Sequence, residues 1–187
     1  MTILAIPGSL RTGSINRSLL EAAVEEAPEG VTIRILDLAG LPFYNGDLDN
    51  PADWPAEALA FADALRSADG VLFATPEYNH VFPGVLGNAL DWASRPLGSV
   101  APLKRKPVAV MGASPGLIGT ARAQDHLKFV LMTIGAQVYS ASGLVVGSAR
   151  AKFEDGQLTD SETRRRLSLF LEAFVTYVHA EPVPALC

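Results

Sequence analysis

Cysteine is nearly absent from this chain of 187 residues, because its single cysteine is the last residue, Cys187. One thiol excludes a disulfide framework and a cysteine-based metal site. A thiol mechanism is not expected either, since a terminal residue must be held in place before it can form a site. The three histidines, His80, His126 and His179, are widely spaced and lack a carboxylate pattern that would complete a ligand set. We therefore expect no metal site.

Long hydrophobic runs and an excess of positive charge are also missing. No apolar stretch approaches the roughly 20 residues that a membrane-spanning helix needs. The net charge is −5, and the only basic run, residues 164–166, is expected to form a solvated helix face. These features predict no membrane and no nucleic acid partner. The chain begins with an apolar, strand-like segment and not with a signal peptide, so a cytoplasmic location is expected.

Apolar runs rich in branched residues alternate with stretches of helical periodicity, which predicts an α/β fold with a five-stranded parallel sheet and helices on both faces. Strands are expected at residues 2–6, 31–36, 70–75 and 107–112, with a last region from 136 into 143–146; helices are expected at 15–27, 55–67, 83–93, 120–134 and 160–179. The length and the 49% apolar content predict one domain over residues 1–180, followed by a C-terminal tail at 181–187.

A glycine-punctuated turn joins the first predicted strand to the first predicted helix. Residues 8–17 read Gly-Ser-Leu-Arg-Thr-Gly-Ser-Ile-Asn-Arg, which places hydroxyls, an amide and positive charge where backbone N–H groups and a helix dipole favour an anion. The turn lacks the Gly-Lys-Ser/Thr ending of a triphosphate loop and the Gly-x-Gly-x-x-Gly spacing of a dinucleotide site. An ordinary strand-to-helix turn is the alternative. The combination of residues favours a smaller phosphate, such as the monoester of a mononucleotide.

Two more unusual loops follow the third and fourth predicted strands, at residues 75–84 and 112–119. In an open parallel sheet such loops all emerge at the carboxyl edge of the strands, so the three loops can share one ligand. With the strand order 2-1-3-4-5, the first and third strands flank the topological switch point, where flavodoxin binds FMN. We expect a phosphate on the first loop and a flat ring against the other two.

Five motifs carry a family resemblance. They are Gly-Ser-Leu-Arg-x-Gly-Ser-x-Asn at 8–16, Leu-Pro-x-Tyr at 41–44, Thr-Pro-Glu-Tyr-Asn at 75–79, Pro-Gly-x-Leu-x-Asn-Ala-x-Asp-Trp at 83–92, and Gly-Ala-Ser-x-Gly at 112–116. In this order they resemble the NADPH-dependent FMN reductase family, which includes bacterial quinone and chromate reductases. The similarity extends from the first strand to about residue 123 and implies a flavodoxin-like fold.

The resemblance also implies which residues bind FMN. The first loop would hold the phosphate, the third-strand loop would line the isoalloxazine and ribityl region, and the fourth-strand loop would approach the ring. The residues so assigned are Ser9, Arg11, Ser14, Ile15, Asn16, Pro76, Glu77, Tyr78, Asn79, Ser114 and Gly116. No catalytic side chain is expected, because hydride passes to and from flavin N5 and the protein mainly positions the two planar partners.

The activity expected from the resemblance is hydride transfer from NADPH or NADH, through FMN, to a small-molecule acceptor. The acceptor classes are quinones, free flavin, azo compounds and oxidised metal ions, and the kinetic mechanism is ping-pong, since one platform over the flavin serves donor and acceptor in turn. Two alternatives remain: a non-enzymatic FMN electron carrier, and a flavin-free dinucleotide-binding regulatory module.

The resemblance also implies a homodimer or a pair of dimers. Asp125 stands where some quinone reductases have a tyrosine of an intersubunit network, which argues against the tetramer, and Gly87 stands where a lysine is common. Leu86, Leu90 and Trp92 share a predicted helix and indicate either core or a subunit contact. The polar, turn-rich segment 37–54 is expected to form a loop at the rim of the site.

Overall fold

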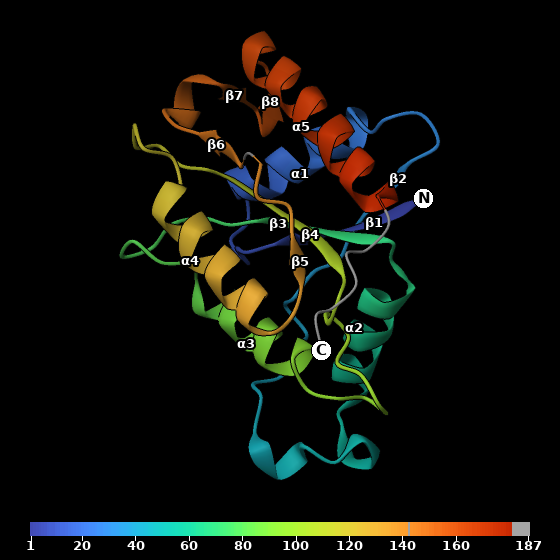
Figure 1. The fold of residues 1–187 in the computed structure, drawn as a ribbon. Coiled ribbons are helices and arrows are strands. Elements are labelled where there is room, and N and C mark those ends of the chain that lie inside the picture. The colour runs from blue at the N-terminus through green and yellow to red at the C-terminus, as the bar shows by residue number, and fades with distance from the viewer. Residues whose placement is uncertain (142, 181–187) are drawn as a thin grey trace.

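The computed structural model describes residues 1–141 and 143–180, so the predicted tail and Cys187 lie outside the described residues. Its centre is a parallel sheet in the order β2-β1-β3-β4-β5 (Figure 1), which confirms the predicted fold class. The strands are β1 (Thr2–Pro7), β2 (Thr32–Ile35), β3 (Gly70–Ala74), β4 (Pro107–Ala113), β5 (Gln137–Val138) and β6 (Leu144–Val146). The carboxyl ends of β1, β3 and β4 therefore lie side by side.

The predicted count of five strands is wrong at the sheet edge. Two short strands, β5 and β6, both pair with β4: β5 opposite Pro107 and Val108, and β6 opposite the stretch Met111 to Ala113. The sequence between them, Tyr-Ser-Ala-Ser-Gly, is poor in the β-branched residues that favour strands. The chain thus pairs with β4 twice, first at β5 and then at β6, which lies nearer the carboxyl end of β4.

Five helices cover both faces of the sheet (Figure 1). They are α1 (Ile15–Glu25), α2 (Ala56–Ser67), α3 (Gly84–Ala93), α4 (Ala121–Thr133) and α5 (Ser161–His179). Successive strand residues point to opposite faces, so Ile3 of β1 packs in the core beneath α1 and α5, whereas Leu4 packs in the core beneath α2, α3 and α4. Burial on both faces explains why β1, β3 and β4 are continuous apolar runs, whereas β2, at the edge of the sheet, alternates between exposed and more buried residues. No helix of residues 1–141 or 143–180 is long and apolar enough to span a bilayer.

The segment between β2 and α2 is anchored on α3. It contains two short 3₁₀ turns, and the Trp92 indole N–H donates to the Pro42 carbonyl oxygen at 2.8 Å. The rings of Tyr44 and Trp54 meet the Trp92 ring edge to face, at centroid distances of 5.2 and 5.1 Å. Trp92 is buried within the chain's own core together with Leu86 and Leu90. Their alternative assignment to a subunit contact is therefore wrong.

A small hairpin after β6 was not predicted. Its strands are β7 (Phe153–Glu154) and β8 (Gln157–Leu158), joined by Asp155 and Gly156, which both have positive φ, as two-residue hairpin turns require. Next to it, Arg164 of α5 reaches α1 and donates to Glu25 at 2.7 Å and to Glu26 at 2.9 Å. The expected solvated face at 164–166 is thus wrong at Arg164, because α5 packs beside α1, and at Arg166, which donates to the Val145 carbonyl oxygen; Arg165 is exposed.

The end of β4 leaves no space for a side chain at Gly112. A Cβ atom there would lie 2.2 Å from the Thr120 hydroxyl oxygen and 2.3 Å from the Thr75 carbonyl oxygen. We predict that Gly112→Ala lowers the free energy of unfolding by about 2 kcal/mol, since overpacking forces backbone shifts. Gly84→Ala is the control, because a Cβ there meets nothing within 4 Å and the expected change is below about 1 kcal/mol. Urea denaturation measures both; equal effects would contradict the prediction.

Candidate functional site

A pocket opens where the loops after β1, β3 and β4 meet. It is lined by Ser9, Arg11, Ser14, Ile15, Asn16, Pro76, Glu77, Tyr78, Ala113, Ser114 and Pro115. Most of the residues that the sequence assigns to FMN therefore lie around one hollow, although they come from distant parts of the chain. Asn79 and Gly116 lie in the same loops but do not line it, whereas Ala113 and Pro115 line it and were not assigned.

The first loop carries hydrogen-bond donors that the protein leaves unused. Within residues 1–141 and 143–180, no acceptor is bound by the backbone N–H groups of Leu10, Thr12, Gly13, Ser14, Ile15 and Asn16. Gly13 has a φ of 70°, which glycine adopts without strain, and α1 begins two residues later. Ser14 is the N-cap of α1: its hydroxyl oxygen accepts from the Arg17 N–H at 3.3 Å, and its hydroxyl hydrogen remains available to an anion.

Two arginines of this region differ in their surroundings. Arg17 donates to Asp37 at 2.5 Å and to Glu21 at 3.2 Å, and the hydrogen bond to Asp37 raises the pKa of its guanidinium. These carboxylates hold Arg17 away from the pocket, which it does not line. Arg11 is exposed and folds over its own loop, where it donates to the Gly13 carbonyl oxygen at 3.0 Å. Arg11 is thus the arginine of this loop that lines the pocket.

Asn16 joins the first loop to β4. Its side chain is 3% exposed, its amide donates to the Ala113 carbonyl oxygen at 3.0 Å, and its amide oxygen accepts from the Ala113 N–H at 2.8 Å. Both polar ends of the amide are therefore engaged with the backbone of a single residue 97 positions away. This positioning contact was missed by the sequence analysis, which placed Asn16 only among the phosphate ligands.

The third-strand loop makes a tight reversal at its tip. Tyr78 and Val81 exchange backbone hydrogen bonds of 3.0 and 3.1 Å, and the two residues between them, Asn79 and His80, have φ values of 53° and 67°. This is the geometry of a two-residue hairpin turn, in which asparagine is common. The turn leaves the Tyr78 side chain 50% exposed at the edge of the pocket. The backbone geometry accounts for Asn79 without a ligand.

Glu77 ties this loop to the start of α4. Its carboxylate accepts from the Ala123 N–H at 3.1 Å and lies 3.4 Å from Nδ1 of His80. Side-chain acceptors at a helix N-terminus satisfy N–H groups that have no partner within the helix. Glu77 therefore fixes the position of the loop that carries Tyr78.

The fourth-strand loop is held closed by Ser114. Its hydroxyl donates to the Gly119 carbonyl oxygen at 2.7 Å, while its backbone N–H donates to Val146 of β6 at 3.0 Å. Gly116 accepts from the Ser148 N–H at 2.9 Å, which places it behind the loop. The rejoining of β6 to the sheet thus supports the loop that borders the pocket.

Apolar side chains project from the loops at this edge of the sheet. Leu117 is 88% exposed, Phe43 is 86% exposed, and Leu10 and Ile118 are also exposed. Phe43 is held outward by its neighbours, because the Asn88 amide donates to the Pro42 carbonyl oxygen at 2.9 Å and accepts from the Tyr44 N–H at 2.8 Å. The loops at the carboxyl edge of the sheet therefore carry exposed apolar surface that does not line the pocket.

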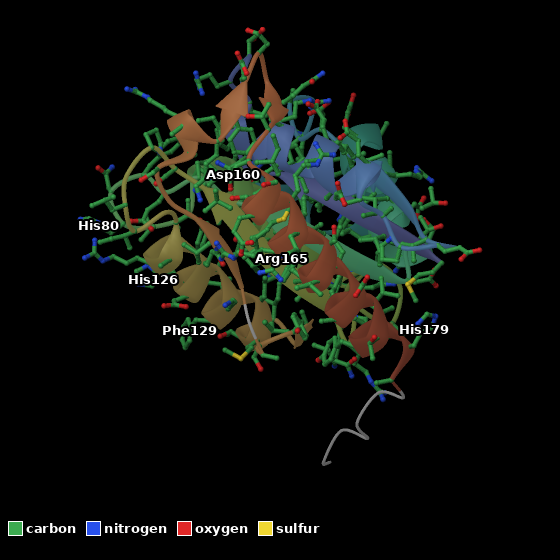
Figure 2. The ribbon with its side chains drawn as sticks, turned by 90° about the horizontal axis from the view of Figure 1, so that it is seen from above. His80, His126, Phe129, Asp160, Arg165 and His179 are labelled. Carbon is green, nitrogen blue, oxygen red and sulfur yellow. The ribbon has the colours of Figure 1, made fainter. Side chains whose placement is uncertain are left out.

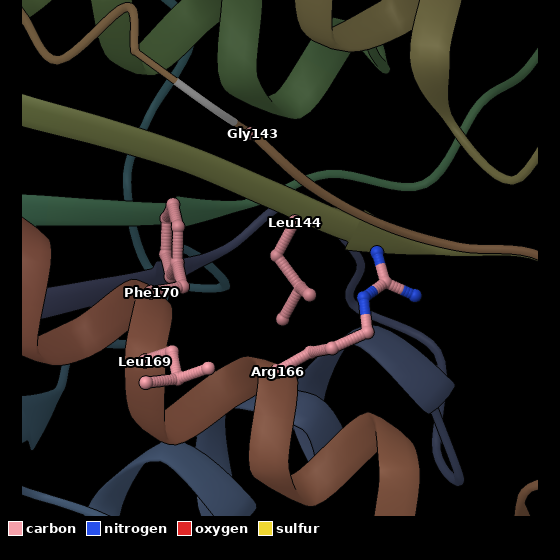
Figure 3. A pocket seen from close by; sticks show the side chains of 5 residues that line it. All are labelled: Gly143, Leu144, Arg166, Leu169 and Phe170. Atoms are coloured by element: carbon pink, nitrogen blue, oxygen red, sulfur yellow. The ribbon is translucent and has the colours of Figure 1, made fainter.

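A second hollow lies between β6 and α5 and is lined by Gly143, Leu144, Arg166, Leu169 and Phe170 (Figure 3). The Arg166 guanidinium at its border donates to the Val145 carbonyl oxygen at 3.3 Å. It belongs to the edge of the sheet and not to the three loops at the strand ends, where open parallel sheets bind their ligands. We therefore do not assign the cofactor to it. In the described part of the chain, no three His, Cys, Asp or Glu residues are grouped so as to hold a metal ion.

Comparison with known proteins agrees with this geometry. A profile of the NADPH-dependent FMN reductase family matches residues 1–151. The chain is 40% identical over 177 residues to an NAD(P)H-dependent FMN reductase of Pseudomonas aeruginosa, with 94% of each chain covered. It is 37% identical over 179 residues to a 2-hydroxy-1,4-benzoquinone reductase of a Burkholderia species, covering 95% of this chain and 96% of the relative.

Solved structures show the same architecture. FerB, a flavoenzyme NAD(P)H:(acceptor) oxidoreductase of Paracoccus denitrificans, superposes with a TM-score of 0.84 at 39% identity, over 95% of this chain and 96% of that one. Flavodoxin 1 of Bacillus cereus, at 18% identity and a TM-score of 0.59, shares the fold. The chain belongs to the NADPH-dependent FMN reductase family and is an oxidoreductase with a flavodoxin-like fold.

Proposed function

We propose that this protein transfers hydride from NAD(P)H, through bound FMN, to a quinone or flavin acceptor. The observation that carries the proposal is the set of unused backbone N–H donors at the start of α1. These donors belong to the first loop, which borders the pocket between the three loops. Donors at a helix N-terminus favour a phosphate. Membership of a family of FMN reductases identifies the mononucleotide to which such a phosphate belongs.

The residues around the pocket fit FMN. Ser9, Arg11, Ser14 and Ile15 would hold its phosphate, and Asn16 would position their loop through Ala113. Pro76, Tyr78 and Ser114 would lie along the ribityl chain and ring, with Glu77, Asn79 and Gly116 supporting them. When bound, FMN supplies the site that accepts and donates hydride. No side-chain acid or base is required of the protein.

The pocket is too small to enclose the whole cofactor. Its volume is about 210 Å³, below the range of about 300–1,000 Å³ typical of clefts that enclose a ligand. Part of the flavin ring would therefore lie outside the pocket, beside the half-exposed ring of Tyr78. A flat, open platform of this kind accepts the nicotinamide donor and the acceptor in turn, and azo compounds and oxidised metal ions remain further acceptors to test.

The first prediction concerns FMN. The purified protein is expected to carry non-covalent FMN and be yellow, and Arg11→Ala should raise the dissociation constant of FMN about tenfold, since it removes a charge-assisted contact to phosphate. Arg34→Ala, at an exposed arginine of β2, is the control. Flavin fluorescence titration of the apoprotein measures the dissociation constant of FMN for the unmodified protein and for both variants. A colourless protein that binds NAD but not FMN would instead support the flavin-free regulatory module.

The second prediction concerns the kinetic mechanism. If donor and acceptor use the same platform, initial-rate plots against the two substrates should be parallel, and excess acceptor should compete with NAD(P)H. Tyr78→Ala should change the ratio of kcat/KM between a quinone and a flavin acceptor several-fold while FMN stays bound, whereas Phe129→Ala, at an exposed aromatic on α4, should not. Intersecting lines would require two separate substrate sites. If the FMN-loaded protein does not oxidise NAD(P)H, the alternative function as a non-enzymatic electron carrier would be supported instead.

We further propose a homodimer, in which a second copy covers exposed apolar side chains that do not line the pocket, such as Leu117 and Phe43. Solvent-exposed apolar groups that gather on one edge mark an interaction surface. Asp125 is exposed on α4, in keeping with a dimer in preference to a pair of dimers. Light scattering at assay concentration is expected to give two chains per particle; a fully active monomer would contradict this.

We also propose that residues 1–180 form a single domain and that the protein is cytoplasmic. The two cores share one sheet, which supports a single folding unit. Cell fractionation tests the location, and one cooperative unfolding transition seen by two probes tests the domain.

A further inference from the structure

Arg122, at the start of α4, is an exposed guanidinium beside the pocket and not in it. Its Nη1 donates to Nδ1 of His80 at 2.9 Å. Within residues 1–141 and 143–180, no carboxylate oxygen lies within 4.0 Å of its nitrogen atoms. In Figure 2, His80 lies beyond the start of α4 and His126 lies further along that helix. Arg122 therefore makes no direct ion pair with the described residues, and the Glu77 carboxylate reaches it only through the same His80 nitrogen.

His80 orients this guanidinium. Since a guanidinium only donates, Nδ1 of His80 must be the acceptor and its ring hydrogen must be on Nε2. The two-residue turn that contains His80 projects the ring from the same loop as Tyr78, and the ring is 70% exposed. Glu77, at 3.4 Å from the same Nδ1, lies on the buried side and is engaged by Ala123. Arg122 and His80 thus face solvent next to the loop that forms one wall of the pocket.

The start of α4 adds to the positive potential. Thr120, its N-cap, makes no side-chain capping hydrogen bond, and the N–H groups of Ala121 and Arg122 bind no acceptor in the described part of the chain. The helix dipole places partial positive charge at this end, and the Glu77 carboxylate, which accepts from the Ala123 N–H, offsets part of it. On a protein with a net charge of −5, a local positive site favours the approach of a highly anionic substrate. Asp125, one turn further, is the nearest acidic residue of α4 in sequence.

We propose that Arg122, oriented by His80, binds the 2′-phosphate of NADPH, an inference that rests on the proposed function. The first loop is assigned to the FMN phosphate, so a second phosphate site at the rim fits the donor. Because Arg122 stands outside the pocket, it suits the end of the donor that is remote from the nicotinamide ring. A planar guanidinium binds a phosphate dianion with two parallel hydrogen bonds.

Arg122→Gln tests the proposal through the ratio of kcat/KM for NADPH to that for NADH. The ratio is expected to fall about tenfold, as for the loss of one charged hydrogen bond. Arg122→Lys keeps the charge and should retain part of the preference. Arg165→Gln is the matched control, since Arg165 is an exposed arginine of α5 that contacts only Glu162 among the described side chains, and it should leave the ratio unchanged.

A binding measurement makes the test independent of turnover. Calorimetry should show that the protein binds adenosine 2′,5′-bisphosphate more tightly than adenosine 5′-monophosphate, and that Arg122→Gln removes most of the difference. Equal binding of the two nucleotides by the unmodified protein, or an unchanged difference in the variant, overturns the proposal. A variant that loses NADPH and NADH turnover equally also overturns it. Failure of the proposed function would appear separately, as no NAD(P)H oxidation by the FMN-loaded protein.

Discussion

The site depends on one buried amide. Asn16 satisfies the N–H and the carbonyl of Ala113 at once, and so it holds the first turn of α1 against the last residue of β4. Without that contact, two backbone groups at the end of a central strand would be buried without partners, which costs more than a single hydrogen bond contributes. Because the first loop and the fourth-strand loop are both adjacent to this contact, their spacing is set by it.

The other loops are joined in the same way, by side chains that bind backbone groups. Glu77 accepts from the start of α4, and Asn88 binds the backbone on both sides of Phe43. Parallel strands cannot hydrogen-bond to one another beyond their ends, so loops at the carboxyl edge need such partners. Each contact leaves the neighbouring aromatic side chain, Tyr78 or Phe43, exposed.

The sequence predicts the sheet order and the location of the site because both follow from patterns that are local. Strands buried on both faces are continuous apolar runs, and the loops between them carry glycine, serine and proline. The role of Asn16 could not be predicted, since its amide binds a residue 97 positions away. The division into β5 and β6 and the hairpin β7–β8 involve strands of two or three residues, too short to show a periodicity. The Asp155-Gly156 pair was the one local signal of the hairpin.

In the two proposals, an acidic protein binds two phosphate-bearing molecules through donors of different kinds. At the first loop the donors are backbone N–H groups, whose partial charges are fixed by the fold and need no counter-ion. At α4 the proposed donor is the side chain of Arg122, which contacts a histidine and, among the described residues, forms no ion pair with a carboxylate. Carboxylate partners elsewhere, as at Arg17 and Arg164, neutralise the guanidinium and make it structural. The nature of the partner therefore distinguishes an arginine that holds the fold together from one that remains available to a substrate.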